Sequence, residues 1–197
     1  MKHLLIILFL TFNCSAQKAE YDVINDFLKT ELLGHSYDTI HVRVEPLPLL
    51  EMIKLYEKAY IERNNENLNS ATVWVTPKIK KWPFIDKDIN EIKDNTTSDK
   101  WKWMIEGFSA KNLVVKDSTI TDIRGFQLSH MNTGKKEYTL KLSKPVFSKN
   151  KKYAIFLVYF NELLLRGNPF PHSGLVIMKK EKNRWTLFSN INEVVYN

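Results

Sequence analysis

The chain has 197 residues, with 29 Lys and Arg against 22 Asp and Glu, a formal net charge of +7, and a single cysteine, Cys14. This length suffices for one domain with a well-buried core, and one cysteine excludes an internal disulfide framework and a cysteine-ligated zinc site. The basic balance is compatible with an anionic partner, but the lysines are scattered through turns, which favours a solvated, lysine-rich surface.

The start of the chain has the pattern of a secretory signal peptide. A short positive segment precedes an apolar run at residues 4–12 and small residues just before Gln17. We expect removal of residues 1–16 and a single α+β domain over residues 17–197, in the periplasm or outside the cell. A lipoprotein with lipid on Cys14 is the alternative. No stretch reaches the roughly 18 apolar residues of a transmembrane helix.

The first part of the mature chain predicts two helices around one strand. Apolar residues fall on one face of residues 20–33, and Gly34 is a suitable stop. Residues 40–45 alternate between apolar and polar, which predicts a strand with a polar outer face. Apolar residues spaced i, i+3, i+4, i+7 and i+11 along residues 49–60 then predict a second helix, with prolines before its first turn.

The middle of the chain predicts short elements. These are strands at residues 72–75 and 113–115, helices around 85–92 and 117–125, and a polar loop at 127–136. Trp101 and Trp103 alternate with lysine and methionine. Tryptophans flanked by lysine can stack on sugars or bases, here with Trp82 after its run of lysines. The interpretation that we favour is that such an alternation forms the buried face of a strand.

The last third predicts a run of antiparallel strands. They lie at residues 138–142, 153–160, 175–178 and 185–188, separated by lysine-rich turns. Residues 153–160 are apolar on both faces, which is typical of a central strand and predicts burial of Phe156 and Val158. The expected fold class is therefore α+β, with N-terminal helices packed on a mainly antiparallel sheet that ends in a C-terminal meander.

Three parts of this meander carry a resemblance: residues 142–148 (LSKPVFS), the lysine turn leading into residues 153–155 (YAI), and residues 179–185 (KKEKNRW). They resemble a recurrent pattern in uncharacterised exported bacterial proteins. Members of this family often carry a cysteine pair between the last two long strands, whereas residues 161–173 contain no cysteine. The resemblance implies export and a shared scaffold, and it implies no activity, because none is established for the family.

Histidines are the first candidates for chemistry. His35, His41, His130 and His172 are spread along the chain without metal-ligand spacing, so we expect neither a metal site nor a cofactor. His41 shares the predicted outer strand face with Arg43 and Glu45, where a general base could stand beside orienting groups. Alternating polar residues on a solvated strand produce such trios routinely. No G-x-S-x-G, P-loop or Rossmann glycine pattern occurs.

The connection at residues 161–173 is the one place where we would look for a binding site. It is longer than most hairpin loops and contains Leu164, Arg166, Phe170 and His172, an apolar anchor with one fixed charge and one titratable group. If its tip is exposed, this composition is typical of an interface hot spot. If the leucines extend the strand and Phe170 folds over the sheet edge, the loop belongs to the core, which is the reading we favour.

The sequence thus predicts an exported, non-enzymatic binding or interaction module of the bacterial cell envelope. Its expected partner is an envelope protein or an anionic polymer, and no nucleic-acid partner is expected. The alternative is a hydrolase of unrecognised type that uses His41, Glu45 or His172. A deep pocket containing two of these side chains would favour the hydrolase.

Overall fold

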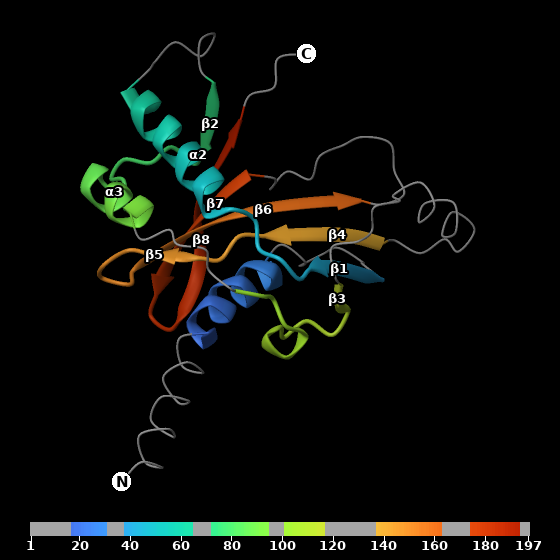
Figure 1. The fold of residues 1–197 in the computed structure, drawn as a ribbon. Helices are drawn as coiled ribbons and strands as arrows, with labels where there is room; N and C mark the ends of the chain where they lie inside the picture. Colours follow the sequence, from blue (N-terminus) through green and yellow to red (C-terminus); the bar gives the residue numbers. More distant parts are fainter. Residues whose placement is uncertain are drawn as a thin grey trace.

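A computed structural model describes residues 17–30, 38–64, 72–94, 101–116, 137–162 and 174–193 (Figure 1). Its strands are β1 (Thr39–Arg43), β2 (Val73–Thr76), β3 (Leu113–Lys116), β4 (Glu137–Leu142), β5 (Val146–Phe147), β6 (Tyr153–Glu162), β7 (Gly174–Glu181) and β8 (Arg184–Glu193). Its helices are the N-terminal helix (residues 17–30), α2 (Leu49–Ile61), α3 (Asp86–Asp94) and the short 3-10 segments η1 (Glu62–Asn64) and η3 (Ile105–Gly107).

The eight strands of the described residues belong to one sheet, in the order β2-β8-β7-β6-β4-β1-β3, with β5 beside β6. The pairs from β4 through β6, β7 and β8 to β2 are antiparallel, whereas β1 pairs in parallel with both β3 and β4. The predicted α+β class and the C-terminal meander are confirmed. The parallel pairs were not foreseen, because they join segments that are far apart in the chain.

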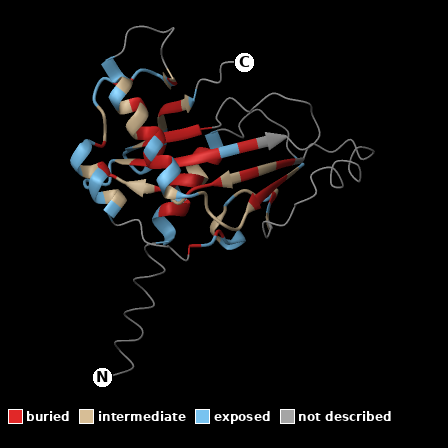
Figure 2. Ribbon diagram, turned by 45° about the horizontal axis from the view of Figure 1, so that its top comes forward, coloured by how far each residue is buried: buried red, intermediate tan, exposed pale blue. Residues whose placement is uncertain are grey.

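Helices cover both faces of the sheet (Figure 1). The N-terminal helix packs on one face and contributes Val23, Ile24 and Phe27 to the first core cluster, together with alternate residues of β4, β6 and β7. On the opposite face, α2 and α3 cover the second core cluster. Figure 2 shows the buried residues concentrated in the strands between these two helical layers.

The strand β6 confirms the prediction of a two-sided central strand. Phe156 and Val158 belong to the first core cluster, and Ile155 and Leu157 belong to the second. Each of these side chains is at most 2% exposed. Near the end of the strand, Tyr159 is 37% exposed, whereas Phe160 on the other face is still buried.

The predicted helix at residues 49–60 is confirmed as α2. Its buried side chains recur at helical spacing: Met52, Ile53, Leu55, Tyr56 and Ala59. Pro48 precedes the first turn with an extended backbone, where the missing N–H of proline costs no helical hydrogen bond. The hydroxyl of Tyr56 donates to the carbonyl of Phe84 and accepts from its N–H, both at 3.1 Å, which ties the chain before α3 to α2.

The other expected elements follow the sequence closely. The N-terminal helix is helical over residues 17–30, with Tyr21, Ile24, Phe27 and Leu28 buried, and residues 31–34 lie outside the described part. β2, α3 and β3 confirm the predictions for residues 72–75, 85–92 and 113–115. The helix and loop expected between residues 117 and 136 also lie outside the described part.

Trp101 and Trp103 do not lie in a strand, yet the alternation correctly predicts that their side chains are buried. Both indoles are buried in the first core cluster, whereas Lys102 and Met104 are exposed. The indole N–H of Trp103 donates to the carbonyl of Leu142 at 3.2 Å. An extended segment can therefore show a strand-like pattern without joining the sheet.

Candidate functional site

The residues of the predicted binding loop, Leu164, Arg166, Phe170 and His172, lie outside the described residues, and so do His35 and His130. The loop hypothesis therefore stays a prediction. Within the described residues, no three His, Cys, Asp or Glu side chains gather in a way that could hold a metal ion.

The trio on β1 differs from its prediction. His41 was expected on a solvated face, but it is only 7% exposed. The reason is that β1 is an interior strand: Val114 of β3 and Thr139 of β4 stand on either side of His41. Arg43 Nε lies 3.8 Å from Glu45 Oε2, and both side chains are partly exposed.

The tryptophans considered as a stacking surface for a ligand are largely covered by the protein, as the favoured interpretation predicts for Trp101 and Trp103. Trp101 and Trp103 are buried, and Trp82 is half-buried, with its ring edge-to-face on Tyr56 and Tyr60. Trp74 on β2, in contrast, is 50% exposed. The strand pattern of residues 73–75 did not indicate that its tryptophan faces solvent.

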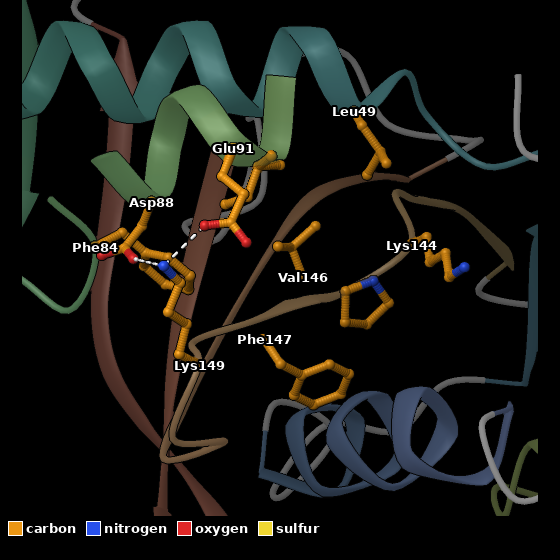
Figure 3. A pocket seen from close by; sticks show the side chains of 10 residues that line it. Leu49, Phe84, Asp88, Glu91, Lys144, Val146, Phe147 and Lys149 are labelled. Carbon is orange, nitrogen blue, oxygen red and sulfur yellow. Dashed lines mark ion pairs between the residues drawn. The ribbon is translucent and has the colours of Figure 1, made fainter. Parts of the chain in front are cut away.

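A groove of about 330 Å³ opens between α3 and β5, and we call it the β5 groove (Figure 3). Its lining residues come from the start of α2, from α3 and the residue run before it, and from β5 with its flanking residues: Leu49, Phe84, Asp88, Glu91, Ile92, Lys144, Pro145, Val146, Phe147 and Lys149. The lining contains apolar side chains and four charged ones, and no His, Ser, Thr or Cys.

One wall of the groove is α3. The carboxylate of Asp88 accepts a hydrogen bond from the N–H of Ile85 at 3.1 Å, which satisfies a backbone donor at the start of the helix. Ile89 is buried in the second core cluster and fixes the inner face of the helix. The outer face, with Glu91 and Ile92, is thereby turned toward β5.

The other wall is β5, formed by the run at residues 142–148 that carries the resemblance described above. Where β4 ends, Ser143 N–H donates to the carbonyl of Leu157 at 3.0 Å, and the hydroxyl of Ser143 accepts from Leu157 N–H at 2.8 Å. Pro145, which has no N–H, separates this point from β5. Val146 packs against the second core cluster and Phe147 against the first, so β5 spans the edge between the two layers.

The turn after β5 is held by its own side chains. Ser148 N–H donates to the carbonyl of Tyr153 at 2.9 Å, and Tyr153 N–H donates back to the Ser148 hydroxyl at 3.0 Å. Asn150 Oδ1 accepts from Lys152 N–H at 3.0 Å, and Lys151 adopts a φ of 53°. This turn, which the sequence indicated, fixes the direction of Lys149.

Lys149 closes one end of the groove (Figure 3). Its ammonium group lies 2.8 Å from Glu91 Oε2 and 3.5 Å from Asp88 Oδ1. The hydrogen bond to Glu91 raises the pKa of Lys149, with a further contribution from Asp88, so the ammonium stays protonated. Two carboxylates share one ammonium there, and Lys144 lies toward the other end, with its ammonium 4.9 Å from the centre of the Trp101 ring.

A second groove of about 290 Å³ lies between α2 and the uncovered end of β6, with Tyr159 on its floor. Charged side chains dominate it, and Lys58 Nζ lies 3.2 Å from Glu193 Oε1. Burial, followed by the nearby Glu51 and Glu193, raises the pKa of Tyr159. Neither groove is lined by His41 or Glu45.

The β5 groove was not predicted, because its two walls are about 55 residues apart and neither has a ligand motif. The signals available in the sequence were the break at Pro145 and the lysine-rich turn, both of which indicate local structure only. No helix among the described residues is long and apolar enough to cross a membrane. Comparisons with protein-family models, with curated proteins and with solved structures find no match.

Proposed function

We propose that the chain is an exported, non-enzymatic interaction module of the bacterial cell envelope, and that its β5 groove holds an apolar side chain of a partner protein. The groove is the observation that supports this proposal. Its apolar lining is bounded by charged groups at both ends, which is the composition of a pocket that receives an anchor residue. Its volume of about 330 Å³ suits one large side chain with its neighbours.

The walls of the β5 groove are held in place by the core, which favours the binding of a partner side chain there. Both sides of the groove are tied to the core, through Ile89 on α3 and through Ser143 and Ser148 around β5. A partner therefore does not have to order these segments on binding, and the entropic cost of association is reduced accordingly.

The charges at the rim favour a particular kind of segment. Asp88 and Glu91 outnumber Lys149 at one end, which favours a basic residue of the partner there. Lys144 at the other end favours an acidic group. We therefore expect an apolar residue with a basic neighbour on one side, rather than a uniformly anionic polymer.

The hydrolase alternative receives no support from the described residues, which do not include His172. His41 is buried on β1 and lines neither groove, and the carboxylates of the β5 groove are engaged by Lys149. A catalytic reading would need a nucleophile or a general base beside an apolar cleft. The described lining of the β5 groove contains no Ser, Thr, Cys or His, and its two carboxylates lie beside Lys149.

The test is a selection of phage-displayed peptides on the immobilised chain. Enriched peptides should carry an aromatic or large aliphatic residue beside Lys or Arg. Their binding should weaken by at least about tenfold with Val146→Glu in the groove wall. The matched control is Val114→Glu, at a 39% exposed valine on β3, which should bind as the unchanged chain does.

Glu91→Lys provides a second variant, because the Glu91 side chain is 52% exposed and its replacement should leave the fold intact. This variant should weaken the binding of peptides that carry Lys or Arg, and not of others. Thermal melts of all variants should confirm that they are folded. If no peptide is enriched, or if folded groove variants bind as well as the unchanged chain, the groove is not the binding site.

A further inference from the structure

The strand β2 ends the sheet on one side. It pairs with β8 alone, from Val73 opposite Glu193 to Thr76 opposite Asn190. Among the described residues, no strand pairs with its outer edge. In an antiparallel ladder, alternate residues direct both backbone groups away from the neighbouring strand. Two residues of β2 therefore present N–H and C=O groups at this edge.

The outer edge of β2 lacks the charged side chains that often prevent edge-to-edge pairing. Such edges are protected by charged residues, by proline or by shortness. β5 has only two residues and follows a proline, and the sequence of β3 includes a lysine. β2 is also short and is followed by Pro77, but its four residues, Val, Trp, Val and Thr, carry no charge.

Apolar side chains of β2 lie on both faces of the sheet. Val73 and Val75 pack toward α2 in the second core cluster. Trp74 points to the opposite face, where it is 50% exposed and stands beside Asn192. A large exposed indole on an uncharged edge strand is a surface that a partner can cover.

We infer that β2 pairs antiparallel with β2 of a second copy of this chain, across a two-fold axis. The strand is self-complementary, because in an antiparallel pair its valine face meets the same valine face and its tryptophan face meets the same tryptophan face. No ionisable side chain of β2 opposes its symmetry mate. The pairing joins the two sheets into one, and it is independent of the β5 groove, which β2 does not line.

Two registers satisfy the backbone groups. In the first register, the backbone N–H and C=O groups of Trp74 and Thr76 face away from β8. The two-fold axis then passes Val75, and each Trp74 stands opposite Thr76 of the second copy. In the second register, the backbone N–H and C=O groups of Val73 and Val75 face away from β8. The axis then passes Trp74, and the two indoles stand opposite each other. Both registers form two hydrogen-bonded residue pairs.

The interface is short, so it predicts a weak dimer with a dissociation constant on the order of 10–100 µM. The formal charge of +7 on each copy repels the other at long range, whereas the contact itself contains no ion pair. Added salt screens this repulsion, so the dimer should become tighter as the salt concentration rises.

Sedimentation velocity over a concentration series measures the dimer. Trp74→Lys and Thr76→Lys each place a charge on the edge and should weaken dimerisation by at least about tenfold. Val114→Lys, at an exposed valine on the other outer strand, should leave it unchanged. A chain that stays monomeric at every salt concentration, or a dimer that persists in folded Trp74→Lys, would overturn the proposal.

Cysteine cross-linking then determines the register. In a Cys14→Ser background the chain has no cysteine, so Trp74→Cys or Val75→Cys introduces the sole thiol. The variant whose new thiol lies on the axis should form an intermolecular disulfide under mild oxidation, and the other should form much less. Equal and slow oxidation of both variants would contradict an ordered β2 pair and point to a different partner for this edge.

Discussion

At the residue scale, two tyrosine hydroxyls fasten loops to the two helical layers. Tyr56 of α2 binds both backbone groups of Phe84, and Tyr21 of the N-terminal helix does the same to Met104, accepting from its N–H at 2.7 Å and donating to its carbonyl at 3.2 Å. Burial raises the pKa of both tyrosines, so each hydroxyl keeps its proton and can donate and accept at once.

The side chain of Phe156 is the best single probe of the core. It is fully buried in the middle of β6, with its ring centre 5.2 Å from that of Phe27 on the N-terminal helix. Phe156→Ala should lower the free energy of unfolding by about 3–5 kcal/mol, because apolar burial is lost and a cavity remains. Urea denaturation measures this loss, which is a large part of the about 5–15 kcal/mol typical of a domain.

Tyr159→Ala in the same strand is the matched control, since Tyr159 is 37% exposed. It removes an aromatic ring of similar size from a site that solvent already reaches. We expect less than half the loss seen for Phe156→Ala. A loss below about 1 kcal/mol for Phe156→Ala would contradict the central position of β6.

At the element scale, ion pairs and buried apolar contacts contribute differently to the stability of α3. Lys149 reaches Glu91 and Asp88, but its side chain is 58% exposed, and pairs in such surroundings contribute little to stability. Burial of Phe84 and Ile89 in the second core cluster contributes more to holding α3 against α2. The ion pairs set the shape and charge of the groove end rather than the stability of the helix.

The carboxylate of Glu62 links η1 to the start of β2. Its oxygens accept hydrogen bonds from Thr72 N–H, at 2.9 Å, and from the Thr72 hydroxyl, and chiefly the latter lowers the pKa of Glu62 below its usual value of 4.5. The link therefore stabilises the native state fully above the unfolded pKa, and this contribution is lost as the pH falls through the native pKa.

The amide proton of Thr72, followed by NMR against pH, should titrate with a midpoint below 4.5. Glu62→Gln should abolish this titration and remove the corresponding part of the acid sensitivity of unfolding, because no ionisable group remains at that position. A midpoint at or above 4.5 would show that the native carboxylate is not favoured by these hydrogen bonds.

At the scale of the whole molecule, one sheet serves two cores. β6 contributes Phe156 to the first core cluster and Leu157 to the second, so each helical layer depends on the same strand. The β5 groove lies at the sheet edge between these layers, where β5 ends after two residues. A binding site at such an edge leaves both cores intact.

The proposed export of the chain is tested on the mature protein. Mass spectrometry of material secreted from a bacterial host should find Gln17 as the first residue, because the leader pattern places cleavage after Ala16. An intact Met1 or a lipid on Cys14 would contradict this proposal. The measurement needs no variant of the chain.

Local burial could be determined from the sequence alone. The spacing of Met52, Ile53 and Tyr56 predicted α2 and its buried face, and the apolar run at residues 153–160 predicted a central strand. Even Trp101 and Trp103 were correctly placed inside, although they form no strand. These features depend on periodicity within one segment, which each segment carries by itself.

Only the tertiary structure decided which faces and edges stay open. Residues 73–75 are apolar throughout, yet Trp74 is 50% exposed on the last strand of the sheet, whereas Trp103 is buried in the first core cluster. His41 is buried between its cross-strand neighbours Val114 and Thr139, which come from two distant strands. Such neighbours come from distant parts of the chain, so no local pattern encodes them, and the β5 groove exists only once α3 and β5 lie side by side.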